Sequence, residues 1–195
     1  TVYQCAQHLG IMLYGGIEVT EWEGDNDIMV QTTKDFRLKT KNLILCTNAF
    51  TAKLIDEDIV PCRGQVIVSE RIENLPCKGP HFYDSGYYYW RDIDQRILLG
   101  GARNKDVEGE NSYDLVPNDT VLAELKRFMN EQIFGREVAI DYEWSGIMGM
   151  GKSNEKQPIV KRLSTNSIVA ARLGGMGVAL SANVAEEVVG LIYDV

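Results

Sequence analysis

The stretch Ser167-Ile-Val-Ala-Ala-Arg172-Leu-Gly174-Gly175-Met-Gly177-Val-Ala-Leu-Ser181-Ala-Asn-Val-Ala-Glu-Glu-Val-Val-Gly-Leu-Ile192 decides the fold. Its apolar first part predicts a buried strand over 168–173, and its last part has the apolar periodicity of a helix that begins at 178. The glycines between them let backbone N–H groups approach a ligand, and the free donors of the first helical turn favour electron-rich or anionic atoms. The same pattern is typical of a plain strand-to-helix turn, and locally it does not decide between the two.

The composition indicates an ordered globular chain. It has 195 residues, of which 45% are hydrophobic and 25% are charged, and it contains no low-complexity tract or internal repeat. The net charge of -8 and the pI near 4.8 argue against a general nucleic-acid binder, because no basic stripe is present to neutralise phosphates.

The cysteines and histidines indicate neither a metal site nor a disulfide framework. There is no CxxC pair, and no cysteine has a histidine at metal-ligand spacing. Such a sparse set of thiols fits a reducing compartment, and we expect a cytoplasmic protein. These residues are Cys5, Cys46, Cys62, Cys77, His8 and His81.

The start of the chain shows no targeting signal. No apolar run reaches transmembrane length, and residue 1 begins no signal-peptide pattern. Thr1 opens the chain within what reads as a helix, so we expect the original start to be missing.

The first sixty residues and the last fifty are expected to form an α/β part, 1–60 and 145–195. Its elements begin with a helix over 2–9 and an antiparallel meander over 17–40. A short buried parallel strand over 43–49 and a helix over 49–55 follow.

Residues 61–144 are expected to form an antiparallel substrate domain with one long helix. The fold class is therefore α/β plus α+β: part of an FAD-type Rossmann-like domain with an inserted antiparallel sheet. The expected elements are strands at 66–69, 81–83, 87–91 and 96–100, a hairpin turn at 92–95, a loop at 104–116, an amphipathic helix from 119 to Gly135, a strand at 138–144 and a glycine-spaced loop at 146–151.

Five motifs occur in one order across almost the whole chain. They are Leu43-Ile-Leu-Cys-Thr-Asn-Ala-Phe-Thr51, Pro61-Cys-Arg-Gly-Gln65, Tyr88-Tyr-Trp-Arg-Asp-Ile-Asp-Gln-Arg-Ile-Leu-Leu-Gly-Gly101, Trp144-Ser-Gly-Ile-Met-Gly-Met150 with Pro158-Ile-Val160, and Ala170-Ala-Arg-Leu-Gly-Gly-Met-Gly-Val178. In this order they resemble the carboxyl-terminal part of the FAD-dependent D-amino-acid oxidase, glycine oxidase and sarcosine oxidase family. The family's GxGxxG fingerprint is absent, because the glycines at 174–177 have a different spacing and no acidic residue follows at the required distance. The resemblance therefore implies a fragment without the amino-terminal half that carries the main FAD-binding unit.

The resemblance assigns cofactor roles to four parts of the chain. It implies backbone contacts from Gly174, Gly175, Met176, Gly177 and Val178 to the flavin carbonyl between the two pyrimidine nitrogens. Val19 would lie against the adenine, and Thr47 and Asn48 would end a strand near the cofactor. Val19, Thr47 and Asn48 also suit positions in an ordinary strand. Arg63 stands at the crossover into the substrate domain, where it would either face the cofactor or form a structural ion pair.

The aromatic run is a candidate substrate surface. In a strand, Tyr87, Tyr89 and Arg91 share one face, with Arg91 suited to a substrate carboxylate, while Tyr88 and Trp90 share the other. The alternative is that the tyrosines pack on the helix over 119–134.

Three departures from the family bear on the substrate and on flavin attachment. Amino-acid oxidases of the family often carry an arginine for the carboxylate at the position of Met148. The sarcosine-oxidase type has a lysine where this chain has Ala179. No cysteine that would tether flavin lies near 148–151, so the resemblance implies non-covalent FAD. Lys152 is the cation in that loop, and it suits a solvated position.

The expected function is oxidation of a C–N bond of an amine or amino acid by hydride transfer to flavin. No acid–base pair is assigned, because the cofactor accepts the hydride. The chain alone is expected to be inactive, and its uncovered α/β surface is expected to favour self-association. The alternative is a cofactor-free binding or oligomerisation domain, truncated or decayed, that keeps only the fold.

Overall fold

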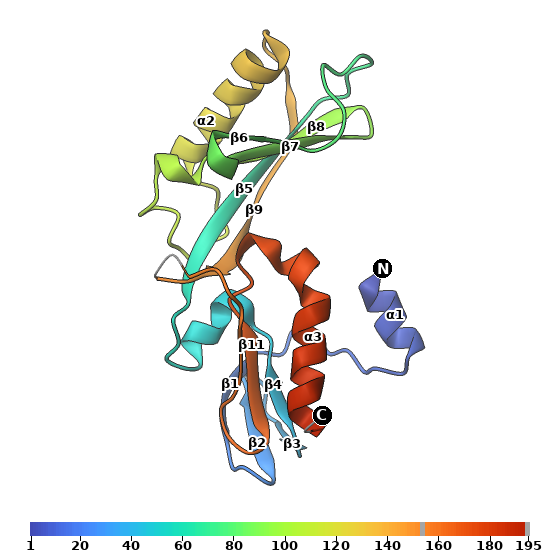
Figure 1. Cartoon of the computed structure of the whole chain (residues 1–195), viewed down its shortest axis with the longest axis vertical. Helices are drawn as coiled ribbons and strands as arrows, with labels where there is room; N and C mark the ends of the chain where they lie inside the picture. The colour runs from blue at the N-terminus through green and yellow to red at the C-terminus, as the bar shows by residue number, and fades with distance from the viewer. Residues whose placement is uncertain (153–154, 194–195) are drawn as a thin grey trace.

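A computed structural model describes residues 1–152 and 155–193. Figure 1 shows an elongated molecule with a five-stranded sheet and helix α2 (Asp119–Phe128) at one end. Two three-stranded sheets and helix α3 (Gly177–Tyr193) lie at the other. Strands β5 (Val60–Ser69) and β9 (Ile140–Met150) run from one end toward the other.

The opening stretch forms the core of the α/β end. Strand β11 (Ser167–Ala171) is buried at all five positions and lies between β10 (Ile159–Arg162), which is antiparallel, and β4 (Leu43–Leu45), which is parallel. Alternate residues of β11 face opposite layers, so that Ile168 and Ala170 pack against α3. The predicted strand and helix are confirmed, although the strand ends at Ala171 because Arg172 has a φ of +60°.

The predicted meander is confirmed, and the predicted parallel strand is shorter than expected. The meander consists of β1 (Val19–Glu23), β2 (Ile28–Thr32) and β3 (Arg37–Thr40), with Ile28 and Val30 of the central strand buried. β4 has only three residues, and its Ile44 is 39% exposed, so the strand is not buried on both faces. The predicted helix after it is a 3-10 helix, η1 (Asn48–Lys53).

The five-stranded sheet is antiparallel, as predicted, in the order β6-β7-β8-β5-β9. Its other strands are β6 (His81–Tyr83), β7 (Tyr88–Ile93) and β8 (Arg96–Gly101). α2 continues into a π-helical segment (Met129–Phe134) and covers one face of the sheet. Apolar side chains of the helix and of that sheet face form one core, which contains Ile67, Ile97, Leu99, Val121, Leu125, Phe128 and Met129.

Both ends of that helix follow the sequence pattern. The side chain of Asn118 accepts hydrogen bonds from the amides of Thr120 and Val121, which caps the first turn. Gly135 has the left-handed conformation that ends a helix, as predicted.

The predicted loop at 146–151 is wrong, because β9 continues to Met150. Its pairing with β5 runs without interruption from Val60↔Met150 to Val68↔Tyr142. The glycines that suggested a loop lie within the strand. The division at 60/61 and 144/145 stays a prediction, and its last range also includes residues 153–154 and 194–195, which lie outside the described residues.

The two outer helices expose apolar side chains. The first helix, α1 (Val2–His8), has a capping box between Thr1 and Gln4 but buries none of its residues, and Val2 is 87% exposed. α3 packs one side on the sheet and leaves Val178 98% exposed on its other side. In contrast to the sequence expectation, the segment Gly174–Tyr193 is long and apolar enough to cross a membrane; among the described residues it is the one such helix, which is weak evidence for a span.

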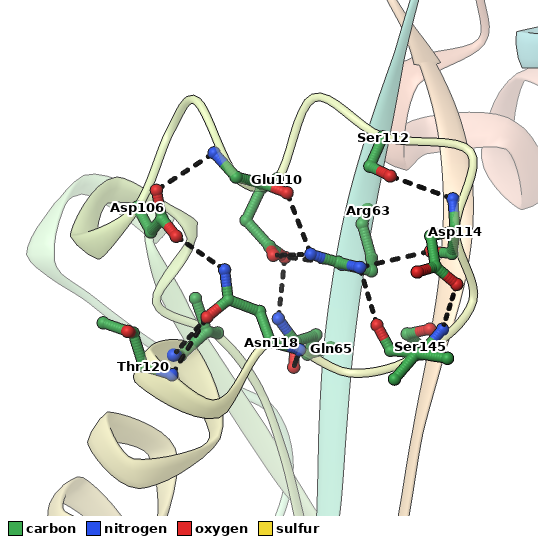
Figure 2. Close-up of polar contacts among 12 residues, drawn as sticks. Arg63, Gln65, Asp106, Glu110, Ser112, Asp114, Asn118, Thr120 and Ser145 are labelled. Carbon is green, nitrogen blue, oxygen red and sulfur yellow. Dashed lines mark hydrogen bonds and ion pairs between the residues drawn. The ribbon is translucent and has the colours of Figure 1, made fainter.

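A buried ion pair joins the five-stranded sheet to the loop that precedes α2 (Figure 2). The guanidinium of Arg63 in β5 donates to Glu110 Oε1 from Nε and Nη2, at 3.1 and 2.8 Å. Its remaining N–H groups donate to the carbonyls of Gly109, Asp114 and Val116. Every donor of the guanidinium is thereby satisfied by the loop.

Gln65 extends this network toward α2 (Figure 2). Its amide donates to Glu110 Oε2 at 2.8 Å, and its carbonyl oxygen accepts from the backbone N–H of Asn118 at 3.0 Å. A second anchor holds the same loop to η1, since Tyr113 lies 5.3 Å from Phe50, ring centre to ring centre, and its hydroxyl donates to the carbonyl of Ala49. The loop is thus bound to both ends of the molecule.

We expect Glu110→Gln to destabilise the protein by about 3–5 kcal/mol, because it leaves the Arg63 guanidinium buried without its counter-ion. Urea denaturation of the full-length protein that carries this chain measures the change. Glu143→Gln is the matched control. It removes a half-exposed ion pair with Lys126 between β9 and α2, for which we expect less than about 1 kcal/mol. Equal effects of the two variants would contradict the structural role of the buried pair.

Candidate functional site

The glycine turn is held in place at its amino-terminal side. Arg172, which has a positive φ, donates to Asp58 Oδ2 at 2.7 Å and to the carbonyl of Gln157 at 3.0 Å. The 3-10 turn η5 (Gly174–Met176) then leads directly into α3. The turn is therefore held by Arg172, which stands two residues before Gly174.

The backbone of this turn is uncovered. A Cβ atom built on Gly175 or Gly177 would approach no other atom closer than 3.8 or 3.7 Å, which is ordinary contact, so packing does not require glycine there. Gly174 does require it, because its φ is +55°. Met176 and Val178 are 59% and 98% exposed. Glycines that the chain's own packing does not need leave room for a ligand against the backbone. The flavin contact that the resemblance implies there stays a prediction.

Asn48 lies at the turn, but it begins η1 and does not end a strand, since β4 stops at Leu45. Its side-chain oxygen accepts a hydrogen bond from the backbone N–H of Leu173 at 3.1 Å, and its own φ is +44°. Gly149 of β9 makes this approach possible, since a Cβ there would lie 2.8 Å from Asn48 Oδ1 and 2.9 Å from the amide nitrogen of Ala49. The side chain of Asn48 thus positions the turn by accepting a hydrogen bond from the backbone at Leu173.

Val19 and Thr47 line one cavity, and no residue of the turn lines it. This cavity has a volume of about 370 Å³, and its other walls come from the residue pair before β1 and from η1. This volume lies within the range of small-molecule sites. The further lining residues are Ile17, Glu18, Phe50, Lys53 and Leu54.

Arg63 does not face the glycine turn or the cavity. All of its donors are used within the loop that contains Glu110, and its side chain is only 8% exposed. The ion-pair alternative is the one that the structure contains.

The aromatic run divides as the strand alternation predicts, except at Tyr87. Tyr88 is 2% exposed and stacks on Phe128 of α2 at 4.3 Å, and Trp90 packs on the same ring. Tyr89 lies on the opposite, uncovered face. Tyr87 precedes β7 in a helical conformation, and its carbonyl accepts from the N–H of Ala102, so it does not continue the face of Tyr89.

The ring of Tyr89 lies over Gly100 of the neighbouring strand. The two residues are cross-strand partners, and a Cβ on Gly100 would lie 2.6 Å from the ring. Burial of the hydroxyl end raises the pKa of Tyr89 above its usual value, and the nearby Cys62 raises it further. Arg91 stands two residues further along the face, exposed, with its Nε bonded to the carbonyl of Asp92.

Met148 connects this face to the glycine turn. It pairs with Cys62 across β5 and β9, and its Cε lies 3.0 Å from where a Cβ of Gly64 would be. Its sulfur lies 3.8 Å from the corresponding point on Gly175. The uncovered sheet face and the turn are therefore parts of one site, joined at the end of the β5–β9 pair.

The sequence reasoning missed two residues of this site. Cys62 is fully buried on the same face, where burial raises the pKa of its thiol. The positive charge of the nearby Arg103 partly offsets that rise in pKa. The pair Gly100-Gly101, separated from Arg103 by Ala102, was the available sequence signal, because two glycines at a strand end indicate a sharp change of direction. No cluster of metal-binding side chains occurs within residues 1–152 and 155–193.

We expect Gly149→Ala to destabilise the protein by about 1–3 kcal/mol, because the added methyl group must displace Asn48 and the backbone of Ala49. Gly146→Ala in the same strand is the control, since no atom lies within 4 Å of the added carbon. Thermal unfolding of the two variants measures the difference. A Gly149→Ala protein as stable as the control would rule out the close packing of η1 on β9.

The chain is similar to known oxidoreductases over nearly its whole length. The family model for FAD-dependent oxidoreductases of the DAO type matches residues 2–191. Glycine oxidase from Geobacillus kaustophilus superposes with a TM-score of 0.78 at 16% identity, covering 97% of this chain and 51% of that one. L-proline dehydrogenase from P. horikoshii superposes with a TM-score of 0.73 at 21% identity, covering 96% and 52%.

A third similar structure was determined with its cofactor. L-α-glycerophosphate oxidase from Mycoplasma pneumoniae, solved with FAD bound, superposes with a TM-score of 0.72 at 17% identity, covering 97% of this chain and 53% of that one. At these identities the likeness shows the fold alone. No curated protein matches the chain.

The chain spans about half the length of the solved structures that it matches. The mixed α/β architecture with antiparallel sheets agrees with theirs. With a family model that covers residues 2–191, the chain belongs to the DAO family of FAD-dependent oxidoreductases.

Proposed function

We propose that the full-length protein oxidises a C–N bond of an amine or amino acid by hydride transfer to a non-covalently bound FAD. The observation that carries the proposal is the position of Met148, which lies next to both the uncovered glycine turn and the open sheet face. This arrangement gives one site two walls: backbone amides at a helix start and a largely apolar sheet surface with Tyr89.

The residues that would hold FAD are those of the turn, with the cavity near β1 as a second contact. The backbone of Gly174, Gly175 and Gly177 would meet the flavin, and the cavity lined by Val19 and Thr47 would receive another part of the cofactor. Bound there, FAD would supply the hydride acceptor. We propose non-covalent binding because the segment 148–151 contains no cysteine.

The side chains and backbone of this chain would bind and orient rather than transfer protons. The unpaired amides and dipole at the start of α3 stabilise electron-rich atoms placed against them. The apolar sheet face would exclude water from the reacting bond, and Tyr89 offers a hydroxyl group at its edge. No acid–base pair is needed from these residues for hydride transfer.

The proposed FAD site needs residues from outside this chain. We propose that β4, β10, β11 and α3 complete an FAD-binding Rossmann-like domain, into which the five-stranded sheet is inserted. The chain alone would then be inactive, because most cofactor contacts belong to the other half. The exposed apolar side of α3 would favour self-association of the isolated chain.

A second candidate function is a cofactor-free binding or oligomerisation domain that keeps only the fold. The observation that favours it is the set of large apolar side chains exposed on α1 and α3, among them Val2, Tyr3, Val178 and Val189. In this case the exposed helices, rather than the glycine turn, would be the functional surface.

Expression of the full-length protein separates the two candidates. We expect purified protein with flavin absorbance that is bleached under anaerobic conditions by a member of an amine and amino-acid panel. If only α-hydroxy or glycerophosphate compounds bleach the flavin, the proposal of C–N oxidation is rejected in favour of C–O oxidation. A colourless protein that binds no added FAD would leave the cofactor-free candidate.

A series of side chains at Gly177 tests the role of the turn. We expect FAD affinity to fall progressively in Gly177→Ala and Gly177→Val, because each added group occupies the space above the backbone. Folding stability should change by less than about 1 kcal/mol, since a Cβ at this position meets only ordinary contacts. FAD titration by fluorescence and thermal unfolding of the apoprotein measure the two quantities. Unchanged FAD affinity in Gly177→Val would exclude the turn as a flavin contact.

A further inference from the structure

Tyr113 lies in the loop between β8 and α2, at a point where the loop is bound to the sheet on both sides of it (Figure 2). Three residues earlier, Glu110 is held by Arg63 of β5 through its side chain and through its backbone carbonyl, the latter at 2.7 Å. On the other side, the guanidinium of Arg63 donates to the carbonyls of Asp114 and Val116. The backbone around Tyr113 is therefore attached to the five-stranded sheet.

The side chain of Tyr113 reaches the other end of the molecule. Its hydroxyl donates to the carbonyl of the buried Ala49 in η1 at 3.1 Å. Its ring lies 5.3 Å from the ring of Phe50, and the ammonium group of Lys53 lies 4.5 Å from the centre of the Tyr113 ring. A cation and an aromatic ring at these distances attract the Tyr113 ring. Tyr113 thus contacts three residues of η1.

η1 in turn holds the glycine turn. Asn48, directly before Ala49, accepts a hydrogen bond at 3.1 Å from the N–H of Leu173, the residue before Gly174. η1 also packs closely on β9, since a Cβ on Gly149 would lie 2.9 Å from the amide nitrogen of Ala49. The hydroxyl of Tyr113 adds a directional contact to η1 from a second element, the loop.

One side chain therefore links the two walls of the candidate site. From Tyr113, contacts lead through the loop to β5, whose Cys62 and Gly64 lie on the open sheet face, and through Asn48 to the glycine turn. We propose that Tyr113 is a positioning residue that sets the distance between the glycine turn and the open sheet face. The inference rests on the proposed function, because a flavin on the turn reacts only with a substrate held at the correct distance from it.

Hydrogen–deuterium exchange of the full-length protein tests the link directly. We expect Tyr113→Phe, which removes only the hydroxyl, to increase exchange at the amides of Leu173 and Met176 by about 2- to 10-fold, the worth of one net hydrogen bond. Both N–H groups are hydrogen-bonded in the turn, to Asn48 and to the carbonyl of Leu173.

Tyr83→Phe is the matched control for this experiment. It also removes one phenol hydroxyl, but its ring lies 5.4 Å from Phe128 of α2, on the opposite face of the sheet. No described residue hydrogen-bonds its hydroxyl. We expect exchange at Leu173 and Met176 to be the same in this variant as in wild type.

The affinity for FAD tests whether the link acts on the cofactor. We expect Tyr113→Phe to raise the FAD Kd by about 2- to 10-fold and to change the visible circular dichroism of the bound flavin. Asn48→Gly removes the acceptor at the turn and keeps a residue that adopts the φ of +44°. If Tyr113 acts through Asn48, the double variant binds FAD no more weakly than Asn48→Gly alone. Losses that add in full would contradict this route.

The outcomes separate this inference from the proposed function. Exchange at Leu173 that is the same in Tyr113→Phe and wild type overturns the inference. Increased exchange with unchanged FAD affinity and an unchanged flavin spectrum also overturns it, because the hydroxyl then serves stability alone. Wild-type protein that binds no FAD rejects the proposed function. In that case increased exchange in Tyr113→Phe still supports the positioning of the turn, and unchanged exchange overturns it.

Discussion

The buried ion pair between Arg63 and Glu110 is the interaction on which the arrangement of the sheet depends. Removing a guanidinium from water is costly, and the cost is offset here because all of its donors have acceptors. Those acceptors lie on one loop, so the pair draws the whole segment between β8 and α2 onto β5 (Figure 2). The amino terminus of α2 is positioned by the same network through Gln65.

The network also determines which face of the sheet stays open. Because Arg63 and Gln65 point toward the loop and α2, the alternating residues Cys62 and Gly64 face the other side. That side receives Met148, Gly146 and the exposed Trp144 from β9, and it ends at the glycine turn. The structural ion pair and the candidate ligand surface thus lie on opposite faces of the same strand.

Local patterns predicted much of the fold. The amphipathic helix after Asn118, the meander and the strand–glycine–helix stretch were found because caps, alternation and helical periodicity are local properties. The continuation of β9 past Gly146 was missed, since glycines read as a loop when the partner strand is not known. That partner, β5, lies some eighty positions earlier and supplies the pairing that makes the segment extended.

The sequence predicted the parts of the candidate site that consist of backbone, but not the parts where side chains from distant segments meet. The glycine turn and Asn48 were singled out as candidate site residues, without their contacts. The partner of Arg63 was not, because Glu110 is 47 residues away and nothing local distinguishes it from a surface glutamate. Tyr89 was placed on the correct type of face by strand alternation, whereas Arg103 follows two left-handed or glycine-dependent positions that no periodicity describes.

The pairing of β4 with β11 has a consequence for how the chain acquires its structure during synthesis. These adjacent parallel strands are separated by more than a hundred residues, so the α/β end cannot close until the last strand has left the ribosome. The five-stranded sheet needs only residues 60–150 and can form earlier. Translation therefore favours an order in which the five-stranded sheet folds first and serves as the surface on which the rest assembles.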